Sequence, residues 1–142
     1  MKCKWCNFDN QSLIIKEYKY WRLSLAESQI LLGWTHASLK RHIYFFEELE
    51  SEELIELKTI IKEVKEVLNE TFKPDWFNVM QLGNITPHLH FQLVPRYKKK
   101  KIFAGREFVD KTYGRPIPDE WVIEERVFLE KLRNHIKKEM KN

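Results

Sequence analysis

The sequence predicts one α+β domain spanning residues 1–142, with an antiparallel sheet of about five strands and two helices. Five short segments are rich in β-branched, aromatic and aliphatic residues, as strands are. Two longer stretches repeat their apolar residues at helical spacing, and they are segregated from the strands instead of alternating with each one. A length of 142 residues suits one domain with a single core.

The strand segments occupy residues 12–15, 20–25, 34–39, 76–82 and 88–94. In the third segment Trp34, His36 and Ser38 alternate with smaller or apolar residues, a period-two pattern typical of strands. The last two segments are joined by residues 83–87, Gly-Asn-Ile-Thr-Pro, which are turn-forming residues.

The first helix is expected to begin at Ser51, a plausible N-cap, and to end before Pro74. Glu52 and Glu53 lie in its first turn, where the helix dipole favours negative charge. Its apolar stripe consists of Leu54, Leu57, Ile61, Val64 and Leu68. A second helix is expected at about 120–138, with Trp121, Phe128, Leu132 and Ile136 on one face.

Composition narrows the class of protein. Hydrophobic residues make up 43% and charged residues 32%, as in soluble globular proteins, and no apolar run reaches the roughly 20 residues of a membrane span. The N-terminus lacks the apolar core of a signal peptide, so a cytoplasmic location without membrane attachment is expected. The net charge of +4 suits a phosphorylated ligand but is low for a dedicated nucleic-acid binder.

The segment expected to carry chemistry is the last strand. Side chains two apart on a strand share a face, so His88, His90 and Gln92 form one polar row, spaced about 6.6 Å apart along the backbone. Apolar residues alternate with them and can pack on a helix. The pattern alone permits either a functional site or a purely structural polar row.

The stretch His88-Leu89-His90-Phe91-Gln92-Leu93-Val94 resembles the signature of the histidine triad (HIT) family, in which histidines alternate with apolar residues. Two upstream stretches are also similar to family landmarks and come in the same order. One is residues 39–42 followed by residues 46–49 and the helix, and the other is residues 78–84, just before the motif. The resemblance covers residues 3 to about 97. It implies a HIT-like α+β sheet, commonly paired into a homodimer, in a nucleotide hydrolase or nucleotidyl transferase.

The resemblance also implies roles for individual residues. His90 would be the nucleophile that attacks an α-phosphorus and holds the nucleotide as a phosphoramidate, with His88 beside it in the catalytic row. Gln92 and backbone N–H groups would stabilise the charge that develops on the phosphoryl oxygens. Asn78 is a candidate for the ribose or for ordering the site. Asn84 could reach a phosphate or the leaving group, and a solvent-facing turn role for it stays open.

Gln92 departs from the family pattern, which has a third histidine at this position. A histidine can pass a proton to the leaving group, whereas an amide can only hydrogen-bond. In having glutamine at this position, the chain resembles two branches of the family. One is the galactose-1-phosphate uridylyltransferases, and the other is a phosphorolytic branch that acts on diadenosine tetraphosphate. Gln92 therefore favours phosphate or sugar-phosphate leaving groups, and water, phosphate and sugar phosphate all stay open as acceptors.

Cys3 and Cys6 form a C-x-x-C pair, which in a reducing compartment indicates metal or redox chemistry more than a disulfide. Some HIT proteins, including the uridylyltransferases, join such a pair to histidines that match His42 and His88. The resemblance thus implies structural Zn²⁺ in a knuckle at residues 3–6, bound by Cys3, Cys6, His42 and His88. The alternative is a pair of reduced cysteines in a frayed terminus.

Two other functions remain open beside the enzyme. One is a zinc-stabilised nucleotide- or RNA-binding module without catalysis, in which His88 and His90 are both ligands or both structural. The other is a protein that binds RNA ends through Arg96 and the lysine run 98–101, which is otherwise a solvated loop. His36 is expected at the surface or in packing, and His135 is expected to be solvated.

Overall fold

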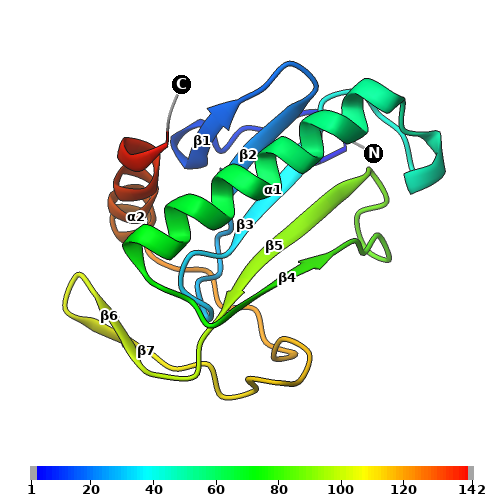
Figure 1. Ribbon diagram of the computed structural model, residues 1–142. Coiled ribbons are helices and arrows are strands. Elements are labelled where there is room, and N and C mark those ends of the chain that lie inside the picture. Colours follow the sequence, from blue (N-terminus) through cyan, green and yellow to red (C-terminus); the bar gives the residue numbers. More distant parts are fainter. Residues whose placement is uncertain (1–2, 141–142) are drawn as a thin grey trace.

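The structure, a computed structural model, describes residues 3–140. Its main sheet is antiparallel, with strand order β1-β2-β3-β5-β4, and α1 crosses one face of it (Figure 1). The strands are β1 (Ile14–Glu17), β2 (Trp21–Leu25), β3 (Thr35–Leu39), β4 (Trp76–Met80), β5 (His90–Arg96), β6 (Lys101–Phe103) and β7 (Arg106–Phe108). The α-helices are α1 (Ser51–Thr71) and α2 (Arg126–Glu139), and two short 3-10 turns are η1 (Gln11–Leu13) and η2 (Phe46–Glu48).

The predicted fold class is confirmed, and all five predicted strands form within a few residues of the expected bounds. The first predicted strand begins later, because residues 11–13 form η1. In α1, Glu50 and not Ser51 is the N-cap, and its backbone N–H donates to the Glu53 carboxylate at 2.8 Å. The predicted helix thus has the right extent but a different cap.

The C-terminal helix begins at Arg126, about six residues later than expected. Residues before it run extended along the loop after β2: Ile123 bridges to Ser28, and the Glu124 N–H donates to the Glu27 carbonyl at 3.0 Å. These backbone bonds compete with helix formation. Trp121 therefore lies outside α2, against the sheet face that α1 leaves open.

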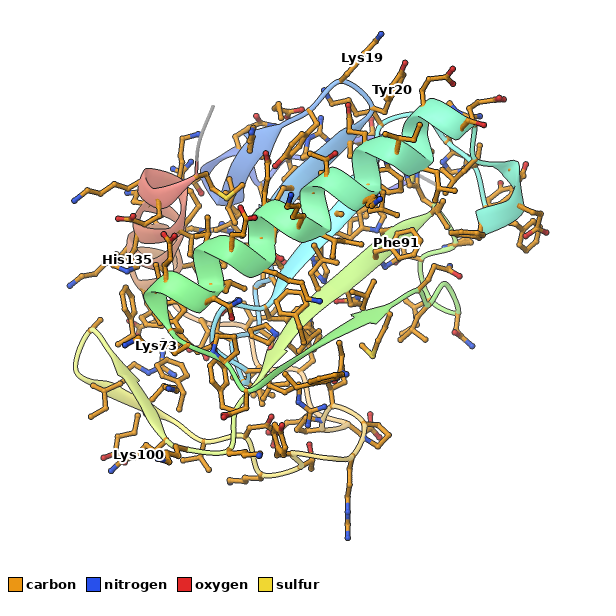
Figure 2. All side chains as sticks on the ribbon, viewed as in Figure 1. Lys19, Tyr20, Lys73, Phe91, Lys100 and His135 are labelled. Atoms are coloured by element: carbon orange, nitrogen blue, oxygen red, sulfur yellow. The ribbon has the colours of Figure 1, made fainter. Side chains whose placement is uncertain are left out.

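One face of the sheet packs against α1. Phe91 and Leu93 of β5 belong to the same buried cluster as Leu57, Ile60 and Leu68 of α1. Figure 2 labels Phe91 beneath α1. The alternation of β5 therefore sends its apolar residues into the core and its polar residues to the other face, as the sequence predicts.

The other face carries two polar rows that cross the strands. Ser38 of β3 lies opposite His90 of β5, and His36 lies opposite Gln92. The rows continue onto β2, where Arg22 faces Ser38 and Ser24 faces His36. Side chains of directly paired residues point to the same side of an antiparallel sheet. The sheet register thus gathers these polar residues beside His90.

Arg96, the last residue of β5, ties the loop after β7 to the sheet. Its guanidinium donates to both carboxylate oxygens of Asp110, at 2.7 and 3.0 Å. It also donates to the carbonyls of Thr112 and Arg115, each at 2.7 Å. The Arg96 and Asp110 side chains are 3% and 0% exposed, so this is a buried and well-satisfied ion pair.

The hairpin of β6 and β7, which projects from the sheet in Figure 1, has no clear signature in the sequence. Each strand has only three residues, too few for a clear alternation. Ala104 and Gly105 form its turn, with φ of 52° and 77°. No helix in the described part of the chain, residues 3–140, is long and apolar enough to cross a membrane.

We predict that Asp110→Asn lowers the free energy of unfolding by about 3–5 kcal/mol, because Arg96 would keep a buried charge without its counter-ion. Urea unfolding followed by circular dichroism would measure the change. Glu107→Gln is the matched control, since Glu107 pairs with Lys100 where the two side chains are 62% and 52% exposed. That change should stay within about 0.5 kcal/mol. Equal effects of the two substitutions would contradict the prediction.

Candidate active site

His90 is the first residue of β5 and is 6% exposed. Its Nδ1 lies 2.8 Å from the backbone carbonyl oxygen of His88. A carbonyl can only accept, so this contact requires the proton on Nδ1 and leaves the Nε2 lone pair free in the neutral ring. The local backbone thus selects the tautomer that a nucleophilic imidazole needs.

Electrostatics keep this imidazole neutral. Burial lowers the pKa of His90, the hydrogen bond to the His88 carbonyl acts in the opposite direction, and the charge of Lys4 lowers it further. Burial likewise lowers the pKa of His36 to about 3. Both rings are therefore uncharged at neutral pH, and a neutral ring can act as a nucleophile without first losing a proton.

Gln92 is oriented by Trp34. The indole Nε1–H of Trp34 donates to Gln92 Oε1 at 2.7 Å. Because an indole N–H is a donor only, the amide oxygen must face Trp34. The two N–H bonds of the Gln92 amide consequently remain available to oxygen atoms of a ligand.

A cleft of about 360 Å³ opens beside His90 and Gln92. Its remaining lining residues come from the N-terminal turn, from β3, from the turn before β5 and from the segment before α2: Lys4, Trp5, His36, Leu82, Gly83, Asn84, Ile85, Thr86 and Trp121. Of the two asparagines predicted to meet substrate, the structure brings Asn84 to this cleft.

Asn78 is placed elsewhere. It pairs with Val94 on β5, one step beyond Gln92 along the same face. Its Oδ1 accepts from Arg96 Nη1 at 2.9 Å, and it lines a second cavity of about 590 Å³ with Arg96 and Tyr113. Its observed contact orders Arg96 and the loop after β7, and it does not line the His90 cleft.

Three aromatic side chains that were not predicted to form the site line the cleft: Trp5, His36 and Trp121. The Trp5 ring centroid lies 4.9 Å from that of His90 and 5.2 Å from that of His36. Trp121 stacks on His36 at 6.2 Å with an interplanar angle of 16°. His36 was expected at the surface or in packing, and it is buried in this group. The sequence offered one signal for Trp5, its position between Cys3 and Cys6, and that signal indicates the cysteine–histidine cluster and not the cleft.

His88 belongs to a different cluster. It lies in the bend before β5, is fully buried, and faces Cys3, Cys6 and His42 instead of the cleft. Each of the four residues offers one ligand atom, and these four atoms all lie within 4.8 Å of one another. The four residues predicted as metal ligands are thus brought together.

The donor set fits a tetrahedral metal. His88 Nδ1 lies 3.2 Å from Cys3 Sγ and 2.9 Å from His42 Nδ1, and Cys6 Sγ lies 3.2 Å from His42 Nδ1. Zinc bonds of about 2.0–2.3 Å imply ligand separations of roughly 3.3–3.8 Å, so these donors would move slightly apart on binding zinc. His88 Nε2 lies 2.6 Å from the Leu39 carbonyl, which fixes its proton there and leaves the Nδ1 lone pair facing the cluster. The cluster could therefore hold a metal ion.

The other chemistry-bearing residues lie outside the cleft. Within the lysine run, Lys100 pairs with Glu107 at 3.0 Å, and Lys101 belongs to β6. His135 of α2 is exposed, as expected, and its ring contacts Phe72 and Phe103. Neither group borders His90.

Comparison with known proteins identifies the class. The family model for the HIT domain matches residues 12–99, and the chain belongs to the HIT family. It is similar to a hypothetical histidine triad nucleotide-binding protein from Sulfolobus tokodaii, with 20% identity, a TM-score of 0.72, and 96% of this chain and 91% of that chain covered. A comparison of the sequence with curated proteins finds no match.

Two further solved structures share the fold. Diadenosine triphosphate hydrolase from Plasmodium falciparum has 15% identity and a TM-score of 0.69, with 91% of this chain and 76% of that chain covered. A zinc-bound histidine triad family protein from Mycobacterium smegmatis has 16% identity and a TM-score of 0.63, with 96% and 91% covered.

Proposed function

We propose that this protein is a nucleotide hydrolase or nucleotidyl transferase that acts at the α-phosphate of a nucleoside polyphosphate or related nucleotide through a covalent nucleotidyl-His90. The observation that carries the proposal is the hydrogen bond from His90 Nδ1–H to the His88 carbonyl at 2.8 Å, beside a cleft lined by His90 itself. The diadenosine triphosphate hydrolase among the structural neighbours supports a nucleotide as the substrate class.

The reaction has two steps. His90 Nε2 donates its lone pair to the α-phosphorus, and the bond to the leaving phosphate oxygen breaks, so that oxygen departs with its electron pair. An acceptor oxygen from water, phosphate or a sugar phosphate then attacks phosphorus, and the P–N bond breaks with its electron pair returning to His90 Nε2. Where the acceptor is water, the proton that it loses on attack is released to solvent. The His88 carbonyl stabilises the positive charge on the ring during attack, and the Gln92 amide donates to the phosphoryl oxygens.

The cysteine–histidine cluster is proposed as a structural zinc site that staples the N-terminal turn to the sheet. A tetrahedral ion would be held by the Cys3 and Cys6 thiolates and by Nδ1 of His42 and of His88. These donors complete four positions without His90, which favours the enzyme over a binding module that uses both motif histidines as ligands. The zinc-bound Mycobacterium smegmatis neighbour supports zinc in this fold.

The remaining expectations concern assembly and location. The homodimer expected from the family resemblance stays a prediction, and the sheet edge at β4, where Trp76 is 67% exposed, is the surface that we expect to pair. A cytoplasmic location suits free thiols that bind a metal.

We predict that incubation with dinucleoside polyphosphates adds one nucleotidyl mass to the wild-type protein and none to His90→Ala. The adduct should be acid-labile, because a phosphoramidate hydrolyses when its nitrogen is protonated. Intact mass spectrometry after a neutral quench measures it. His135→Ala is the matched control, since His135 is exposed on α2 and lies outside the cleft. An adduct that persists in His90→Ala would exclude His90 as the nucleophile.

The leaving group should be a phosphate and not an amine. The Gln92 amide cannot supply a proton, and general acid catalysis is typically worth about 10²–10⁴-fold. We therefore predict slower turnover of an adenosine phosphoramidate than of dinucleoside polyphosphates, with the gap narrowed in Gln92→His. Steady-state rates for both substrates provide the measurement. Equal or faster turnover of the phosphoramidate by the wild type would refute the assignment.

Zinc should be present at about one atom per chain and should be lost in Cys3→Ser, together with a lower melting temperature. Elemental analysis and thermal unfolding test both expectations. Ser12→Ala, outside the cluster, serves as the control for changes near the N-terminus. A zinc-free wild-type protein with the same melting temperature as the zinc-loaded protein would contradict the proposed structural zinc site.

A further inference from the structure

The turn between Cys3 and Cys6 lines the cleft. Cys3 and Cys6 face His42 and His88 in the cysteine–histidine cluster. The two residues between them, Lys4 and Trp5, line the cleft beside His90. The turn is closed by the Asn7 N–H, which donates to the Cys3 carbonyl at 3.0 Å. The segment 3–6 therefore directs its two end residues to the cysteine–histidine cluster and its two central residues to the cleft.

Lys4 is the single charged side chain among the residues that line this cleft in the described chain. The other residues of the lining are two histidines and apolar, aromatic or uncharged polar side chains. A nucleotide brings negative charge on every phosphate, and such charge is stabilised by a nearby cation. The composition of the cleft thus leaves Lys4 as its source of positive charge.

The surroundings of Lys4 keep that charge available. Its Nζ lies 5.0 Å from the centroid of the Trp5 ring, a cation–π contact. Among residues 3–140, no carboxylate lies within 4.0 Å of this ammonium. Arg22, which faces Ser38 in the row that ends at His90, is by contrast paired with Glu17 at 2.8 Å.

Trp5 holds the turn against the nucleophile. It is 3% exposed and contacts the rings of His90 and His36. Its backbone carbonyl accepts from Arg22 Nη1 at 3.5 Å. A residue so enclosed fixes the position of its neighbour in the turn, so Lys4 stays at the mouth of the cleft while its side chain remains exposed.

We propose that Lys4 is the phosphate-binding cation of the His90 cleft and that the metal cluster presents it there by fixing the turn at Cys3 and Cys6. This rests on the proposed function, since it specifies how that site recognises the anionic part of a nucleotide. The ligand class is a nucleotide with at least two phosphates. The cluster then acts on recognition as well as on stability.

The test compares a ligand with phosphates to one without. Isothermal titration with α,β-methylene ADP, whose bridging carbon resists cleavage at the α-phosphorus, is run beside titration with adenosine on zinc-loaded full-length protein. Lys4→Gln should weaken binding of the methylene analogue about tenfold or more and leave adenosine within about twofold, as loss of a charge-assisted hydrogen bond does. Lys4→Arg should restore most of the affinity.

Two controls isolate the contact. Lys99→Gln removes an exposed lysine outside the cleft and should bind both ligands as the wild type does, which accounts for net charge. Zinc content equal to wild type in Lys4→Gln shows an intact turn. In a Cys3→Ser background, Lys4→Gln should have no further effect beyond about twofold, because the turn is already released.

The outcomes separate this inference from the function beneath it. If Lys4→Gln binds the methylene analogue as tightly as wild type, or loses adenosine equally, Lys4 is not a phosphate ligand, although the His90 adduct still forms. A full Lys4→Gln effect in the Cys3→Ser background overturns presentation by the metal. Wild-type protein that binds neither ligand and forms no adduct overturns the proposed function and this inference together.

Discussion

The hydrogen bond between His90 Nδ1–H and the backbone carbonyl of His88 joins the two halves of the site. On one side of this peptide segment, the His88 ring is anchored by the Leu39 carbonyl and faces the cysteine–histidine cluster. On the other side, the His90 ring holds the tautomer in which Nε2 has a free lone pair. A displacement of the bend at His88 would therefore change both the donor set of the cluster and the protonation of the nucleophile. The geometry of the cleft depends on that short segment of backbone.

Strand periodicity was sufficient to predict much of this arrangement. The alternation in β5 predicts correctly that His90 and Gln92 face away from the core while Phe91 and Leu93 pack on α1. It does not predict that His88 leaves the row, because period two assumes a regular strand. The backbone at this point pairs with the segment after β3 instead: the Leu89 N–H donates to the Ile43 carbonyl at 2.9 Å. Such a tertiary contact has no signature in the local sequence.

The positions of the aromatic side chains that line the cleft are even less predictable from the local sequence. Trp121 fits the apolar stripe of the predicted second helix, yet tertiary pairing of Ile123 with Ser28 holds the segment extended and turns Trp121 toward His36. Trp5 lies next to predicted metal ligands, which points to the cluster but not to the cleft. His36 carries no pattern beyond strand alternation, and only the register of β3 against β5 places it across from Gln92. Residue type and spacing predict which strands form, whereas register and loop path decide which side chains meet.

The hydrogen bonding of Gln92 bears on which leaving group the cleft can stabilise. Trp34 donates to the amide oxygen of Gln92, so the amide nitrogen lies on the other side and can donate to a ligand, and Lys4 offers a positive charge. Both groups stabilise negative charge on oxygen. The Gln92 amide does not ionise, so it cannot supply a proton to a leaving group. A cleft built in this way lowers the energy of a leaving group that is stable as an anion, such as a phosphate, and gives little help to an amine that must be protonated to depart. The replacement of the third histidine by glutamine is therefore matched by its surroundings: Trp34 orients the amide oxygen toward itself, and the amide N–H groups and Lys4 favour oxyanions.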